Sequence, residues 1–142
     1  MNVPQFIQAD NALAYARQVG LIADESSYQV RELTGGVSNI VLLVEPTDAS
    51  ADGSFANQSL SSQPFVLKQA REQLRVGQPW FCDVRRIWRE VDVLLALSQL
   101  LRDLPCDAGL RLQVPKILWE DRENYLYAMT AIDPSIPTWK EQ

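Results

Sequence analysis

The stretch at residues 33–44 reads LTGGVSNIVLLV and is the most informative part of this chain. Two glycines and two small polar residues separate the end of one strand-like segment from the start of the next, which is typical of a tight turn between strands. Gly35 and Gly36 let backbone N–H groups approach an anion, and Ser38 and Asn39 add side-chain donors. The composition therefore predicts a hairpin whose turn can hold phosphate. A Gly-Gly turn alone most often only connects two strands.

A lysine stands near the end of the next predicted strand. Residues 65–69 read FVLKQ, an apolar run that presents Lys68 from a strand. A lysine placed in this way beneath a glycine-rich loop can pair with nucleotide phosphates. The alternative is an ordinary solvated charge at the edge of a sheet. The neighbouring features favour the phosphate-binding interpretation.

A long amphipathic helix is predicted over residues 80–104, with a carboxylate on its apolar side. At 100° per residue, Glu90 falls among the apolar side chains of this helix, which are Ile87, Leu94, Leu97 and Leu101. Because burying a lone carboxylate is expensive, Glu90 needs a partner, and Lys68 is the expected one. The alternative is that Glu90 lies at the edge of the apolar stripe and pairs with Arg86 or reaches water.

The remaining segments predict an α+β domain. A helix is expected over residues 4–19 with Gly20 just beyond it, and Asp83 is expected to cap the long helix. Trp80, Trp88 and Trp119 are expected to pack in the core or between helix and sheet. Strands are expected over residues 28–33, 40–45, 65–69, 114–119 and 125–129, with a loop over residues 46–64. The expected fold is a five-stranded antiparallel sheet with one long crossing helix and an extra N-terminal helix.

The composition fits one globular domain and excludes several functions. The chain has 142 residues, of which 46% are hydrophobic and 22% charged, which is enough for a single core. The net charge of -5 argues against a nucleic-acid surface. With two cysteines and no histidine, the chain offers neither a zinc site nor Ser-His-Asp or Cys-His catalysis. No segment resembles a signal peptide or a membrane span, so we expect a cytoplasmic protein without a membrane partner.

The order of these features resembles the N-terminal lobe of the protein-kinase-like phosphotransferases. The sequence GGVSN at residues 35–39 resembles the Gly-Gly-x-Ser/Thr-Asn loop of the aminoglycoside phosphotransferase, choline kinase and methylthioribose kinase group. It differs from the G-x-G-x-x-G loop of protein kinases. The sequence VLKQA at residues 66–70, followed by LRV at residues 74–76, Trp80 and residues 86–90, is similar to methylthioribose kinases in particular. The resemblance runs from about residue 28 to the end of the chain.

The resemblance implies an ATP site built from ten residues. Lys68 would bind the α- and β-phosphates and Glu90 would position Lys68. Met129 would lie at the back of the adenine pocket, and the backbone of Thr130 and Ile132 would offer hydrogen bonds to adenine. The triphosphate would be covered by Gly35, Gly36, Val37, Ser38 and Asn39.

The resemblance also implies an ATP-dependent small-molecule kinase that uses Mg²⁺ and phosphorylates a hydroxyl group. Residues 1–133 would form the ATP-binding lobe, and residues 134–142 would begin a C-terminal lobe that supplies the acid, the metal ligands and the acceptor pocket. No catalytic residue or metal ligand is then expected in this chain, which would be inactive alone as a fragment of a longer enzyme. The alternatives are a natural short protein, either a catalytically inactive nucleotide-binding or regulatory module or a structural interaction domain.

Overall fold

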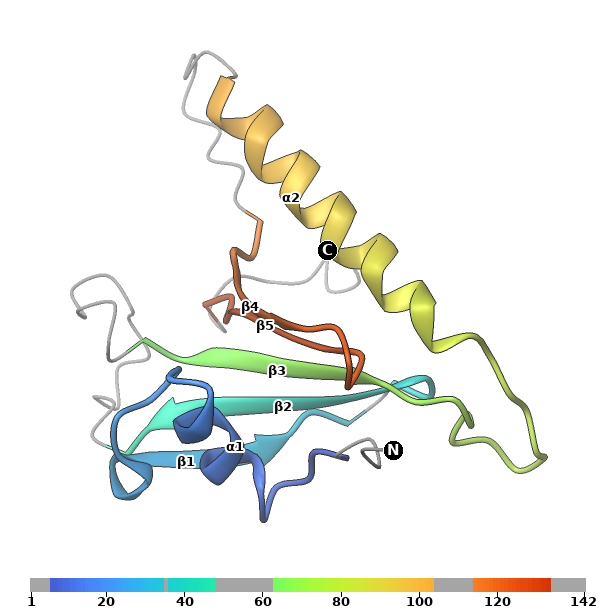
Figure 1. Ribbon diagram of the computed structural model, residues 1–142, viewed down its shortest axis with the longest axis horizontal. Helices are drawn as coiled ribbons and strands as arrows, with labels where there is room; N and C mark the ends of the chain where they lie inside the picture. The colour runs from blue at the N-terminus through green and yellow to red at the C-terminus, as the bar shows by residue number, and fades with distance from the viewer. Residues whose placement is uncertain (1–5, 35, 48–62, 104–113, 134–142) are drawn as a thin grey trace.

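A computed structural model describes residues 6–34, 36–47, 63–103 and 114–133. In this part of the chain the fold is α+β, with one open antiparallel sheet of five strands and two α-helices (Figure 1). The helices are α1 (Ala12–Gln18) and α2 (Ile87–Asp103). The strands are β1 (Tyr28–Glu32), β2 (Asn39–Pro46), β3 (Phe65–Ala70), β4 (Ile117–Asp121) and β5 (Leu126–Thr130), in the spatial order β1-β2-β3-β5-β4. The α+β class and the five antiparallel strands are therefore confirmed.

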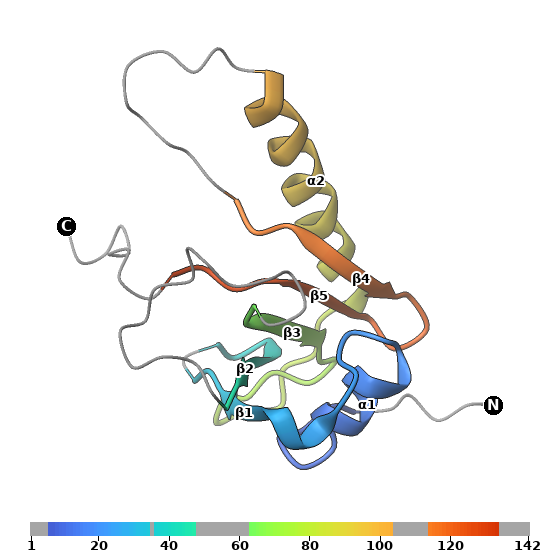
Figure 2. The same cartoon turned by 90° about the vertical axis from the view of Figure 1, so that its left-hand side faces the viewer.

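The sheet separates two hydrophobic cores, because successive side chains of a strand point to opposite faces. Figures 1 and 2 show α1 and α2 on different sides of the strands. The larger core lies under α1, and its sheet residues are Ile40, Leu42, Val44, Phe65, Leu67, Leu126 and Ala128. The smaller core lies under the start of α2, and its buried residues are Ala70, Ile87, Val91 and Tyr127. Lys68, between Leu67 and Gln69, belongs to the α2 face.

The first helix is shorter than the sequence indicates. It covers Ala12–Gln18, whereas residues 6–11 are not helical and residues 1–5 lie outside the described part of the chain. Asn11 explains the late start, because its Oδ1 accepts from Gln8 N at 2.8 Å and its Nδ2 donates to the Phe6 carbonyl at 3.0 Å. Such local side-chain bonds compete with helix formation. Gly20 follows α1 at φ +80°, in the left-handed region that suits a glycine after a helix.

The second helix begins later than predicted. Residues 84–86 form a single 3₁₀ turn before α2, and Asp83 caps this turn by accepting from Arg85 N at 2.9 Å. Trp80 is 65% exposed, so the prediction that it packs in the core is wrong. Its carbonyl accepts from Leu74 N at 2.8 Å, which holds Trp80 in the connection between β3 and α2. Leu104, the predicted end of the helix, lies outside the described residues.

Only the first part of α2 packs closely on the sheet. Ile87 and Val91 are buried and Leu94 packs against the smaller core, as the predicted stripe requires. Leu97 is 38% exposed, because α2 runs away from the sheet after its first turns (Figure 1). The apolar stripe therefore predicts the burial of this helix only near its start. Among the described residues, neither helix combines the length and apolar character needed to cross a membrane.

Helix α1 is tied to the β4–β5 hairpin by polar contacts. Tyr15 Oη donates to Asp121 Oδ2 at 2.8 Å and accepts from Trp119 Nε1 at 3.3 Å. Asn124 donates from N and Nδ2 to the two oxygens of Asp121, at 3.1 and 2.9 Å. Trp119 is 38% exposed, so it is less buried than predicted. Trp88 does pack against the smaller core, and Arg122 lies over its ring at 4.5 Å from the centroid.

The contacts of Asp121 predict a loss of stability in acid. Burial acts to raise the pKa of Asp121, but the hydrogen bonds from Asn124 and Tyr15 outweigh it and lower the pKa. Since the folded pKa lies below the unfolded value of about 3.9, this stabilisation is present above about pH 4 and is lost as the pH falls through the folded pKa. We expect Asp121→Asn to lower the free energy of unfolding by about 1 kcal/mol at neutral pH, and by progressively less below about pH 4.

Urea unfolding at a series of pH values measures this difference. Asp92→Asn, at an exposed position on α2, is the matched control and should change the free energy of unfolding at neutral pH by less than about 0.5 kcal/mol. A cost for Asp121→Asn that stays constant from neutral pH into acid would contradict the assignment.

Candidate functional site

Lys68 and Glu90 form the ion pair that the sequence predicts. Lys68 Nζ lies 2.6 Å from Glu90 Oε2. Lys68 is presented by β3 on the α2 face of the sheet, and Glu90 lies in the first turn of α2. The alternative pairing of Glu90 with Arg86 is not observed, because the Arg86 guanidinium contacts other groups. Two segments far apart in the sequence thus bring opposite charges together at one place.

Tyr127 supports this pair from the neighbouring strand. Lys68 and Tyr127 are register partners on β3 and β5, and Tyr127 Oη donates to Glu90 Oε2 at 3.1 Å. Burial, followed by the charge of Glu90, raises the pKa of Tyr127 well above that of an ordinary phenol, so the hydroxyl remains a donor at neutral pH. The side chains of Lys68 and Glu90 are 20% and 41% exposed, so a ligand can reach the pair. Tyr127 was not identified from the sequence; its place two residues before Met129 indicates only that the two side chains share a face of the sheet, and its contact with Glu90 depends on the fold.

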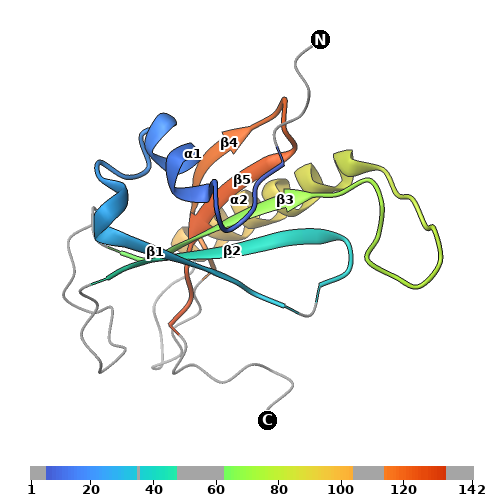
Figure 3. The same ribbon diagram turned by 90° about the horizontal axis from the view of Figure 1, so that it is seen from below.

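The glycine-rich hairpin lies where β3 leads into α2. Figure 3 shows the turn between β1 and β2 at the same end of the molecule as the start of this connection. The Ser38 carbonyl accepts from Arg71 N at 3.1 Å, and the Val37 carbonyl accepts from Arg75 N at 2.8 Å. Because the C=O and N–H of a trans peptide point in opposite directions, the N–H groups of Ser38 and Asn39 point away from the connection. This orientation leaves the hairpin amides directed away from residues 71–75.

The turn itself is exposed. Gly36 and Val37 are exposed, Ser38 and Asn39 are partly buried, and Gly35 lies outside the described residues. A Cβ placed on Gly36 would meet only the Asn39 carbonyl oxygen, at 3.9 Å, which is an ordinary contact. The described protein atoms therefore leave room for a methyl group at Gly36. If only glycine is tolerated at position 36, the reason would have to be a bound ligand that leaves no room for a side chain.

Met129 lies on the same face of the sheet as Lys68. Val66 is the register partner of Leu43 on β2 and of Met129 on β5, so these three residues form an apolar row across the sheet. The next row contains Val41, Lys68 and Tyr127. Val41, Leu43 and Val66 were missed in the sequence. Counting in twos from Lys68 would have indicated Val66, whereas the places of Val41 and Leu43 depend on the register of β2 against β3.

Thr130 and Ile132 lie at the far end of β5. Thr130 N donates to the Lys116 carbonyl at 2.9 Å, and Thr130 Oγ1 accepts from Lys116 N at 2.9 Å. The N–H of Thr130 is thus engaged within the protein, so in a hydrogen bond with adenine Thr130 would have to accept with its carbonyl oxygen. Ile132 is 59% exposed, beyond the end of the strand.

An open pocket lies on the face of the sheet opposite to Lys68. It has a volume of about 550 Å³, and its lining residues are Gln8, Ala9, Asp10, Glu32, Ile40, Arg71 and Arg75. Ile40 belongs to the core under α1, which places this pocket away from Lys68. Its two arginines are balanced by two carboxylates, and Arg75 Nη1 already pairs with Glu32 Oε1 at 2.7 Å.

The described residues contain no group of three or more His, Cys, Asp or Glu side chains arranged to hold a metal ion. Cys82 is a free thiol, and Cys106 lies outside the described residues.

The chain was also compared with known proteins. A scan against protein-family models finds no match, and a search of curated proteins finds none.

Proposed function

We propose that this chain is the ATP-binding lobe of a phosphotransferase that moves the γ-phosphate of ATP to a hydroxyl of a small molecule. The proposal includes a protein-kinase-like N-terminal lobe. The observation that carries it is the 2.6 Å contact between Lys68 Nζ and Glu90 Oε2, made by a strand and a crossing helix. The pair lies next to a glycine-rich hairpin, because Lys68 is the register partner of Val41, two residues after Asn39.

The donor set at this place fits a nucleoside triphosphate. The Lys68 ammonium would neutralise charge on the phosphate oxygens, and the Ser38 and Asn39 amides would add neutral donors. Glu90 would hold the Lys68 side chain in place. The ammonium hydrogens that are not bonded to Glu90 would remain available to the ligand. The apolar row of Val66, Leu43 and Met129 would provide a surface for the base.

When bound, ATP supplies the transferable phosphoryl group, and the residues of this chain bind and orient it. The described residues do not provide a donor set for Mg²⁺. From the sequence resemblance we propose that the metal ligands, the catalytic acid and the acceptor pocket belong to a C-terminal lobe. The acceptor is proposed only as a small hydroxyl compound, with methylthioribose as the leading example from the sequence resemblance. A regulatory module that binds ATP without transferring phosphate would use the same Lys68 and Glu90.

Gly36→Ala tests the proposal through ligand binding. The described atoms leave room for the added methyl group, so we expect the free energy of unfolding to change by less than about 1 kcal/mol. In a hairpin that closes on phosphate, the same methyl group should weaken ATP binding by roughly tenfold, because it keeps the backbone from the ligand. The measurement is a titration of the chain with MgATP, followed by NMR or calorimetry.

Gly77→Ala is the matched control, since a Cβ on Gly77 meets no atom within 4 Å and Gly77 lies in the connection after β3. Gly77→Ala should leave the affinity for MgATP unchanged. The proposal fails if the wild-type chain shows no saturable binding of MgATP, or if Gly36→Ala binds it as tightly as the wild-type chain.

A further inference from the structure

Arg86 ends the 3₁₀ turn that leads into α2 and joins this turn to the glycine-rich hairpin. Its Nη2 donates to the Ser38 carbonyl at 2.5 Å, to Asn39 Oδ1 at 3.2 Å and to the Arg71 carbonyl at 3.2 Å. Its Nη1 donates to the Asp83 carbonyl at 2.8 Å. One guanidinium therefore contacts the hairpin, the end of β3 and the residue that caps the turn before α2.

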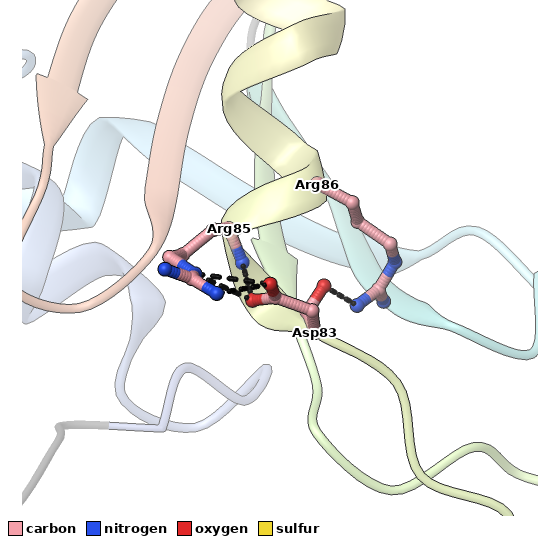
Figure 4. Close-up of polar contacts among 3 residues, drawn as sticks. All are labelled: Asp83, Arg85 and Arg86. Atoms are coloured by element: carbon pink, nitrogen blue, oxygen red, sulfur yellow. Dashed lines mark hydrogen bonds and ion pairs between the residues drawn. The ribbon is translucent and has the colours of Figure 1, made fainter.

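Arg85 and Arg86 are neighbours in sequence but differ in what they contact. Figure 4 shows the two side chains extending to different sides of Asp83. Arg85 pairs with the Asp83 carboxylate at 2.7 Å and its side chain is 76% exposed. Arg86 instead bonds to the Asp83 backbone and extends to the hairpin. Arg85 is therefore largely solvated, whereas Arg86 is held against the backbone of the hairpin.

Arg86 and Glu90 are four residues apart, which is about one helical turn. Arg86 binds the hairpin, and Glu90 binds Lys68. A shift of the start of α2 would therefore move both contacts together. A planar guanidinium suits this role, because it presents several fixed donors at once, whereas a lysine is a single flexible point of charge.

We infer that Arg86 is a positioning residue that fixes the glycine-rich hairpin relative to α2, so that the hairpin and the Lys68–Glu90 pair act as one unit. The link between the hairpin and the helix is made by the hydrogen bonds of Arg86. The consequence for nucleotide binding rests on the proposed function. Two experiments keep these parts separate.

The first experiment uses amide hydrogen exchange of the nucleotide-free chain. Arg71 N and Arg75 N donate to hairpin carbonyls and report on the position of the hairpin. We expect Arg86→Gln to speed the exchange of both amides by about tenfold, with Arg86→Lys close to Arg86→Gln. Arg85→Gln is the matched control and should leave both rates unchanged. The core amides of Leu42 and Leu67 should keep their protection, which distinguishes a local release from general loosening.

The second experiment is a double-mutant cycle on MgATP affinity. If the hairpin and the ion pair act together, Arg86→Gln and Lys68→Met should each weaken binding, and the double variant should be about tenfold tighter than the product of the two effects predicts. The inference is overturned by unchanged exchange at Arg71 and Arg75, by equal acceleration of the core amides, or by additive effects on affinity. Absence of MgATP binding in the wild-type chain would remove the proposed function, while the exchange experiment would still decide the link between hairpin and helix.

Discussion

Lys68→Met is expected to weaken ATP binding by roughly 10- to 100-fold while the protein stays folded. A hydrogen bond to a charged group contributes about 1.5–3 kcal/mol, which corresponds to this range of affinity. Methionine keeps the unbranched stem of lysine and removes the ammonium. The ion pair with Glu90 is partly exposed, so its loss should lower the free energy of unfolding by less than about 1 kcal/mol. The hydrogen bond that Tyr127 donates to Glu90 does not involve Lys68, so we expect the variant to keep it.

Titration with MgATP and urea unfolding, on the same preparation, measure the two quantities. Lys116→Met is the matched control, because Lys116 is exposed at the edge of the sheet and its described contacts are made by its backbone. It should leave the affinity unchanged. In a longer enzyme containing this lobe, phosphate transfer should be lost with Lys68→Met and retained with Lys116→Met. A structural interaction domain would instead keep every activity after Lys68→Met.

Gln69→Leu should give the largest loss of stability among the variants considered, about 2–4 kcal/mol. Gln69 is 1% exposed in the core under α1. Its Oε1 accepts from Ile7 N at 2.8 Å, and its Nε2 donates to the Asn124 carbonyl at 2.9 Å. Leucine has a similar size but removes both hydrogen bonds, and each buried backbone group that loses such a partner costs about 1–3 kcal/mol.

Urea or thermal unfolding followed by circular dichroism measures this loss. Gln73→Leu is the matched control, because Gln73 is exposed four residues later, and it should change the free energy of unfolding by less than about 0.5 kcal/mol. A cost for Gln69→Leu as small as that of the control would mean that the N-terminal segment does not depend on this side chain. Faster amide exchange at Ile7 in the variant would confirm that the lost contact is the hydrogen bond from Ile7 N to Gln69 Oε1.

Local sequence patterns predicted four of the five strands within one residue, placed β4 two to three residues too early, and predicted the helices less well. The strands around the glycine-rich turn and around Lys68 were predicted within one residue at each end, because alternation and flanking turn residues mark short strands clearly. The helices were predicted too long. The side chain of Asn11 and the backbone of Trp80 make hydrogen bonds that compete with the helix, and apolar spacing alone does not reveal such bonds.

The candidate site, like the fold, could be predicted from the sequence only in part. The pairing of Lys68 with Glu90 could be predicted, since helical periodicity placed an acid on an apolar face and strand alternation supplied one lysine to meet it. The roles of Arg86, Gln69 and Tyr127 could not, because each depends on atoms 37 or more residues away in sequence. Neighbouring residues dictate backbone conformation and the face on which a side chain lies. The register of β3 against β5 places Tyr127 beside Lys68, and folding brings Arg86 to the hairpin and Gln69 to Ile7, because contacts over such distances exist only after the chain has folded.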